Sequence, residues 1–137
     1  MAEVLTEYLE SATRSAWSWG EQDCTLWVAD FVLLVTGLDP GISFRGKYKT
    51  RLGCERLLKR RGGLVALVSD AMAAADIAGT NDPGRGDVGI IPATIRRRRA
   101  DMIEATAAIC LGQGRWAVFS PRGLLVAPTQ HTAAWSI

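Results

Sequence analysis

Residues 23–37 read Asp-Cys-Thr-Leu-Trp-Val-Ala-Asp-Phe-Val-Leu-Leu-Val-Thr-Gly. Asp23 is a residue type that caps the start of a helix, and Gly37 is a type that ends one. The residues between them are apolar almost all round, which is typical of a helix buried at the centre of a domain. The sequence therefore predicts a central helix with Cys24 in its first turn.

Three further helices are expected around this central one. Apolar residues recur every three or four positions near the N-terminus, which predicts an amphipathic helix from about residue 3 to residue 16. Thr50 is placed to open a shorter helix, and the glycine pair at 62–63 ends it. The alanine-rich residues 64–76 form the fourth helical stretch.

From Asp87 onward the pattern changes to short β-prone runs. Residues 120–123, Ser-Pro-Arg-Gly, suit a tight turn between two of them. Helices first and strands second predict a single α+β domain over residues 1–137, in which the N-terminal helices pack on a C-terminal antiparallel meander. The expected runs cover residues 88–91, 103–112, 115–120 and 124–128, and the tail at 133–137 is a further candidate.

The composition is typical of a soluble domain without a large net charge. Lys and Arg number 16 against 14 Asp and Glu, so the overall charge does not indicate nucleic acid as a partner. No signal peptide is recognisable at the N-terminus, and no run of about 18 apolar residues predicts a membrane span. Cys24, Cys54 and Cys110 are odd in number and widely spaced, which indicates free thiols.

Cys24 is the best candidate for a nucleophile. The first turn of a helix carries unpaired N–H groups and the positive end of the dipole, which favour a thiolate. The alternative is a small core residue, because cysteine is among the residue types most often buried.

Three segments resemble the landmarks of the NlpC type of cell-wall peptidase, in the same order. Residues 17–28 read Trp-Ser-Trp-Gly-Glu-Gln-Asp-Cys-Thr-Leu-Trp-Val, residues 86–88 read Gly-Asp-Val, and residues 108–112 read Ala-Ile-Cys-Leu-Gly. The opening, the Thr-Gly-Leu-Asp-Pro segment at 36–40 and the late tryptophan strand are most similar to an uncharacterised family found mainly in phages and prophages. The resemblance implies a papain-like α+β fold.

The same resemblance implies roles for individual residues. Cys24 falls on the nucleophile position, with Asp23 before it, but the catalytic histidine position falls on or near Thr106. The third polar member would lie near residues 116–118, where Trp-Ala-Val offers no partner for an imidazole. Asp87 corresponds to a structural residue that bonds backbone amides. The resemblance thus implies a non-catalytic component of a phage tail that binds other virion proteins, made in the host cytoplasm and then carried in the virion.

His131, the chain's only histidine, provides the alternative. If it folded back to Cys24, the pair would form a cysteine hydrolase dyad acting on peptide or amide bonds of peptidoglycan. Otherwise His131 is a surface residue near the C-terminus. No cofactor is expected, and no metal either, because the three cysteines and His131 lack the close pairs of a zinc site.

Two further features leave their roles open. The run Arg96, Arg97, Arg98 and Arg99 is either a solvated loop or edge, or a docking patch for an acidic partner or phosphate. Trp17 and Trp19 flank the turn before Cys24. Three roles are open for them: lining a substrate cleft, fixing the turn by a hydrophobic contact, or binding a partner protein at an interface.

Overall fold

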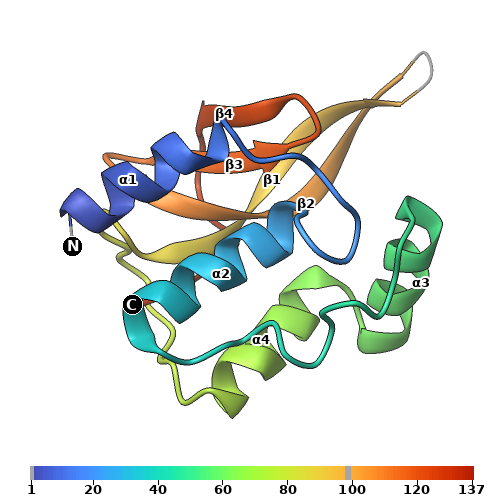
Figure 1. Ribbon diagram of the computed structural model, residues 1–137, viewed down its shortest axis with the longest axis horizontal. Coiled ribbons are helices and arrows are strands. Elements are labelled where there is room, and N and C mark those ends of the chain that lie inside the picture. Colours follow the sequence, from blue (N-terminus) through green and yellow to red (C-terminus); the bar gives the residue numbers. More distant parts are fainter. Residues whose placement is uncertain (1, 98–99) are drawn as a thin grey trace.

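The computed structural model describes residues 2–97 and 100–137, and it confirms the α+β class (Figure 1). Four helices precede the sheet along the chain. Five antiparallel strands follow. The helices are α1 (Ala2–Ala12), α2 (Cys24–Thr36), α3 (Arg51–Arg61) and α4 (Leu64–Ala74), and the strands are β1 (Val88–Arg97), β2 (Ala100–Gly112), β3 (Arg115–Ser120), β4 (Gly123–Pro128) and β5 (Ala133–Trp135).

The sheet is a meander whose last strand returns to the far edge. The strand order is β4-β3-β2-β1-β5, so β5 pairs with β1 and lies away from β4, which precedes it in the chain. The expected tail strand is therefore confirmed, and it covers the outer edge of β1. Val88 lies opposite Ile109 on one side and opposite Trp135 on the other.

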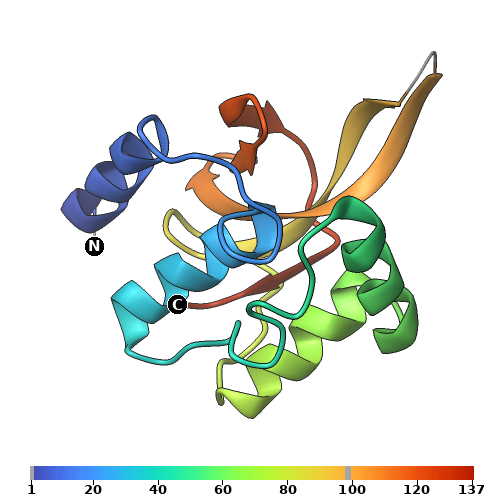
Figure 2. The same cartoon turned by 45° about the vertical axis from the view of Figure 1, so that its right-hand side comes forward.

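Helix α2 packs against one face of the sheet (Figures 1 and 2). Side chains alternate across a strand, so neighbouring residues enter different clusters. Ala107 and Ile109 of β2 join the core with Trp27 and Phe31 of α2, whereas Ala108 packs on the other face. The start of α2, which carries Cys24, is thus held over β2.

The caps of α2 are those expected, but its burial is not. Asp23 accepts a hydrogen bond at the first turn, and Gly37 adopts the left-handed conformation at the last. The prediction of a helix buried almost all round is wrong near the C-terminal end of α2, where Leu33 is 40% exposed and Leu34 is 59% exposed. These two residues lie on the side of α2 that neither the sheet nor another helix covers.

Two other helices end earlier than expected. The chain leaves α1 after Ala12, not residue 16, because the amides of Thr13 and Arg14 bond to carbonyls three residues back and tighten the chain into a turn. Helix α4 ends at Ala74, and Asp76 adopts a positive φ of 58° that cannot continue a helix.

Strands β1 and β2 are longer than the sequence predicts and extend from the body as a two-stranded arm (Figures 1 and 2). Arg96 and Arg97 belong to β1, opposite Asp101 and Ala100, so of the loop and the edge expected for this run these two residues take a strand position. Arg98 and Arg99 lie outside the described residues. Pairing between the two strands extends the arm without help from the rest of the sheet.

Candidate functional site

The start of α2 is fixed by the buried carboxylate of Asp23, which is 1% exposed. Oδ1 accepts the amide of Leu26 at 3.0 Å, and Oδ2 accepts the amide of Gly20 at 3.0 Å. The Tyr48 hydroxyl also donates to Oδ2. One carboxylate therefore caps the helix and joins it to the turn before it and the loop after it.

Cys24 follows directly and presents its sulfur to two threonine hydroxyls. Thr25 Oγ1 lies 3.7 Å from Cys24 Sγ. The side chain of Thr106 in β2 lies near enough to the sulfur to lower the pKa of the thiol. Thr106 is 8% exposed and lies opposite Ile91 in the sheet. The structure thus brings together Cys24 and the residue that stands where the resemblance puts a histidine.

These surroundings keep the thiol protonated. Burial raises the pKa of Cys24 above its ordinary value, and the charge of Asp23 raises it further. Hydrogen bonds from Thr106 and Thr25 lower the pKa, but they do not offset the burial. Burial and the charge of Asp23 therefore oppose the thiolate that a helix start favours.

A second thiol lies in the same neighbourhood. Cys54 of α3 packs against the cluster that contains Tyr48, and burial together with the charge of Asp23 raises the pKa of Cys54 to about 12. Burial is also the main reason that the pKa of Tyr48 lies well above its ordinary value, and Asp23 adds to it. This role of Tyr48 could not be predicted from the sequence, because Tyr48 lies in an irregular segment where no periodicity shows which way a side chain points.

His131 lies elsewhere. Its ring is 6.0 Å from the ring of Trp116, which is buried in the cluster on the face of the sheet away from α2. His131 also lines an open groove of about 350 Å³ together with Thr80 and Asn81. Among the described residues, His131 is not one of the groups that shift the pKa of Cys24. The structure therefore does not bring the two members of the alternative dyad together.

The segment expected to carry the third polar member has no polar side chain to offer. Trp116 and Ala117 are buried in the core, on opposite faces of the sheet, and Val118 is partly buried. Packing accounts for each of these residues.

The two tryptophans before Cys24 pack against the domain. The rings of Trp17 and Trp19 meet edge to face, with centroids 5.0 Å apart. Trp17 also stacks on Phe119 of β3 at 5.9 Å. Both side chains are partly buried, so they hold the turn against the core.

Asp87 bonds backbone amides, as expected of a structural residue. Its Oδ2 accepts the amide of Gly84 at 2.8 Å, and its Oδ1 accepts the amide of Ile137 at 3.0 Å. The carboxylate joins the turn before β1 to the segment that follows β5.

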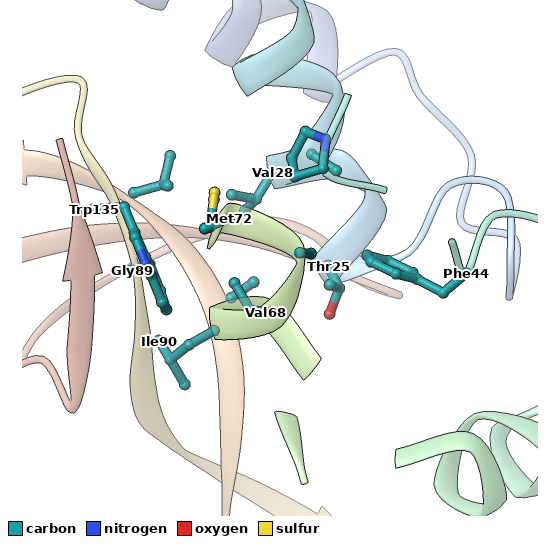
Figure 3. Close-up of a pocket in the computed structure, with 13 residues that line it drawn as sticks. Thr25, Val28, Phe44, Val68, Met72, Gly89, Ile90 and Trp135 are labelled. Carbon is teal, nitrogen blue, oxygen red and sulfur yellow. The ribbon is translucent and has the colours of Figure 1, made fainter. Parts of the chain in front are cut away.

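The pocket next to Cys24 is too small for a substrate (Figure 3). Thr25 is one of its walls, and the other walls are almost entirely apolar residues of α2, the loop after it, α4, β1, β2 and β5. Its volume of about 20 Å³ is near the minimum for one water molecule. Residues around it include Val28, Phe44, Val68, Met72, Gly89, Ile90 and Trp135.

Comparison with known families now adds one finding. A family model described as a domain of unknown function matches residues 1–137. The chain belongs to the DUF6950 family. Neither the curated proteins nor the solved structures contain a match to this DUF6950 chain.

Two classes of site were also sought in this DUF6950 domain. Within residues 2–97 and 100–137, no group of three or more His, Cys, Asp or Glu side chains is arranged to hold a metal ion. In the same part of the chain, no helix combines the length and apolar character that a membrane span requires.

Proposed function

We propose that this DUF6950 chain is a non-catalytic domain with a papain-like fold of the NlpC type. The observation that carries the proposal is that Thr106, and no imidazole, is the β2 side chain near enough to Cys24 to affect the pKa of its thiol. A cysteine nucleophile of this type needs an imidazole to take its proton, and a threonine hydroxyl cannot act as a base near neutral pH. The presence of threonine near Cys24, where the resemblance implies a histidine, supports the loss of catalysis.

The raised pKa of Cys24 supports the same conclusion. The thiolate is the reactive form of cysteine, and burial raises the pKa of this thiol. Its nearest charged neighbour is Asp23, whose negative charge disfavours a second anion. Cys24 therefore acts as a packing residue between α2 and β2.

We assign the chain to the structural or assembly components of a phage virion, with other tail proteins as its partners. This assignment is supported by the resemblance of residues 17–28 and 36–40 to a family found mainly in phages and prophages. A domain that has kept a peptidase fold without a working site acts through its surfaces. It would be made in the host cytoplasm and then built into the virion.

Alkylation of Cys24 by iodoacetamide as a function of pH tests the proposal. The background is Cys54→Ser with Cys110→Ser, so that a single thiol reacts. The expected result is slow alkylation whose midpoint lies above the unperturbed cysteine pKa of about 8.5 and does not change in His131→Ala. A midpoint well below that value, rising when His131 is removed, would instead support the cysteine hydrolase.

A gain of reactivity sharpens the test. Thr106→His places an imidazole next to the sulfur, and we expect Cys24 to be alkylated at least about tenfold faster at pH 7. Thr106→Gln is the matched control, because it adds similar bulk without a base. Equal rates in the two variants would show that position 106 does not correspond to the catalytic histidine.

A further inference from the structure

Helix α1 carries a stripe of acidic residues on its exposed surface. Glu3, Glu7 and Glu10 are spaced four and three residues apart, which places them on one side of the helix. All three are exposed, and the helix contains no Lys or Arg. Within the described part of the chain, none of the three forms an ion pair.

Helix α3 and the loop before it carry the opposite charge. Residues 47–61 contain seven Lys or Arg and one Glu, although the whole chain has a net charge of only +2. Arg56, Lys59 and Arg60 lie on one side of the helix and are exposed. Among the described residues these three are also without ion pairs. The net charge of the whole chain is therefore small only because the basic residues 47–61 are balanced by an excess of acidic residues elsewhere in the chain.

Helix stability explains only part of this pattern. An acid in the first turn and bases in the last turn favour a helix through its dipole, which accounts for Glu3, Lys59 and Arg60. Like charges three or four residues apart disfavour it, and Glu7, Glu10 and Arg56 form such pairs. Both stripes contain like charges that repel each other within one helix. An opposite charge on another molecule would relieve this repulsion.

The two stripes lie at opposite ends of the molecule. Helix α1 is at one side and α3 at the other in both views (Figures 1 and 2). They are separated by α2 and the sheet, so they cannot neutralise each other within one copy. Each has an exposed apolar residue in the same helix, Val4 at 37% in α1 and Leu52 at 55% in α3.

We infer that copies of this chain associate head to tail, with the acidic stripe of α1 in one copy against the basic stripe of α3 in the next. A second copy accounts for both stripes, whereas a nucleic acid would account for α3 alone. Contacts between two different surfaces repeat from copy to copy and give a ring or an open chain. Because the contact is mainly electrostatic, it weakens with salt.

Sedimentation velocity of the full chain with exchanged charges tests this inference. The acidic stripe is reversed in Glu3→Lys with Glu7→Lys and Glu10→Lys, and the basic stripe in Arg56→Glu with Lys59→Glu and Arg60→Glu. The wild type is expected to associate at about 50 mM salt and at least tenfold more weakly at about 500 mM. Each triple variant alone should associate at least about tenfold more weakly than wild type, and an equal mixture of the two should recover to within about threefold.

The control is Arg85→Glu with Arg115→Glu and Arg122→Glu, which changes the net charge equally at exposed sites outside α3. It should associate like the wild type, and circular dichroism should show every variant folded. A wild type that stays monomeric at low salt, or a mixture that does not recover, would overturn the inference. Binding of duplex DNA by a monomeric wild type, lost in the α3 variant, would assign the basic stripe to nucleic acid instead.

The inference does not depend on the proposed loss of catalysis. Cys24→Ala should leave the association constant unchanged, because Cys24 lies outside both stripes. A failure of self-association would likewise leave the alkylation result standing.

Discussion

The Tyr48 hydroxyl donates a hydrogen bond to Oδ2 of Asp23, the residue that precedes Cys24. Tyr48 is buried in a loop twenty-five residues further along the chain, and it also contacts Cys54 in α3. The cap of one helix is thus linked to the loop that leads into another. Replacing either partner should reveal how much of the site's order depends on this link.

We expect Asp23→Ala to lower the free energy of unfolding by about 3 kcal/mol. The loss of a helix cap costs about 1 kcal/mol, and the buried donors of Tyr48 and Gly20 lose their acceptor. Urea denaturation at pH 7 measures the change. Asp23→Asn is the control with the same shape and should cost less, because its amide oxygen can still accept the bond from Leu26. A loss below about 1 kcal/mol for Asp23→Ala would contradict this account.

Thr106→Val should make Cys24 less reactive. Removing the hydroxyl removes a hydrogen bond that lowers the pKa of the thiol, so alkylation should move to higher pH and slow at pH 8. The pH dependence of iodoacetamide modification measures this in a background without Cys54 and Cys110. Thr25→Val should have a smaller effect, because Thr25 contributes less than Thr106. If both variants react like the wild type, the hydroxyls are not bonded to the sulfur in solution.

Alkaline pH should destabilise the domain. Burial, and next the charge of Asp23, raise the pKa of Cys54 to about 12 and that of Tyr48 well above its ordinary value. In the unfolded chain these groups ionise near pH 8.5 and pH 10, so the stability they contribute is complete below those values and is lost as pH rises above them. Urea denaturation at pH 7, 9 and 10.5 should show a falling free energy of unfolding. Tyr48→Phe should flatten the decrease above about pH 10, and an unchanged slope would count against buried Tyr48 as its source.

Two glycines with similar backbone angles should tolerate alanine very differently. Gly20 has a φ of 81°, and a Cβ built there meets the carbonyl oxygen of Tyr48 at 1.8 Å. Gly37 has a φ of 77° with open space around it. We expect Gly20→Ala to cost at least about 3 kcal/mol and Gly37→Ala about 1 kcal/mol, measured by urea denaturation. Similar losses would mean that backbone angle alone decides the cost.

Helix ends were predictable because they depend on nearby residues. Asp23 and Thr50 each accept an amide bond from three residues ahead, and Gly37 and Gly62 each adopt the left-handed conformation. Such bonds form within a single turn, so the residue types indicate them directly. The early end of α4 was missed because Asp76 is not a residue type that usually marks a positive φ as glycine does.

Strand lengths and the site depend on contacts between distant residues. Arg96 and Arg97 extend β1 because β2 pairs with them, and no local pattern in the arginine run indicates that pairing. The neighbourhood of Cys24 and Thr106 was expected only through the resemblance to NlpC-type sequences. The contact of Tyr48 with Asp23 was missed, since the direction of a loop side chain is decided by tertiary packing.

The place of β5 beside β1 bears on how the domain matures during translation. Val88 and Ile90 are fully enclosed only when Trp135 and Ala133 pair with them, more than forty residues later. While those last residues are still inside the ribosome, β1 has a free edge and the core is open to solvent. The nascent chain therefore completes its sheet only after synthesis has passed residue 135.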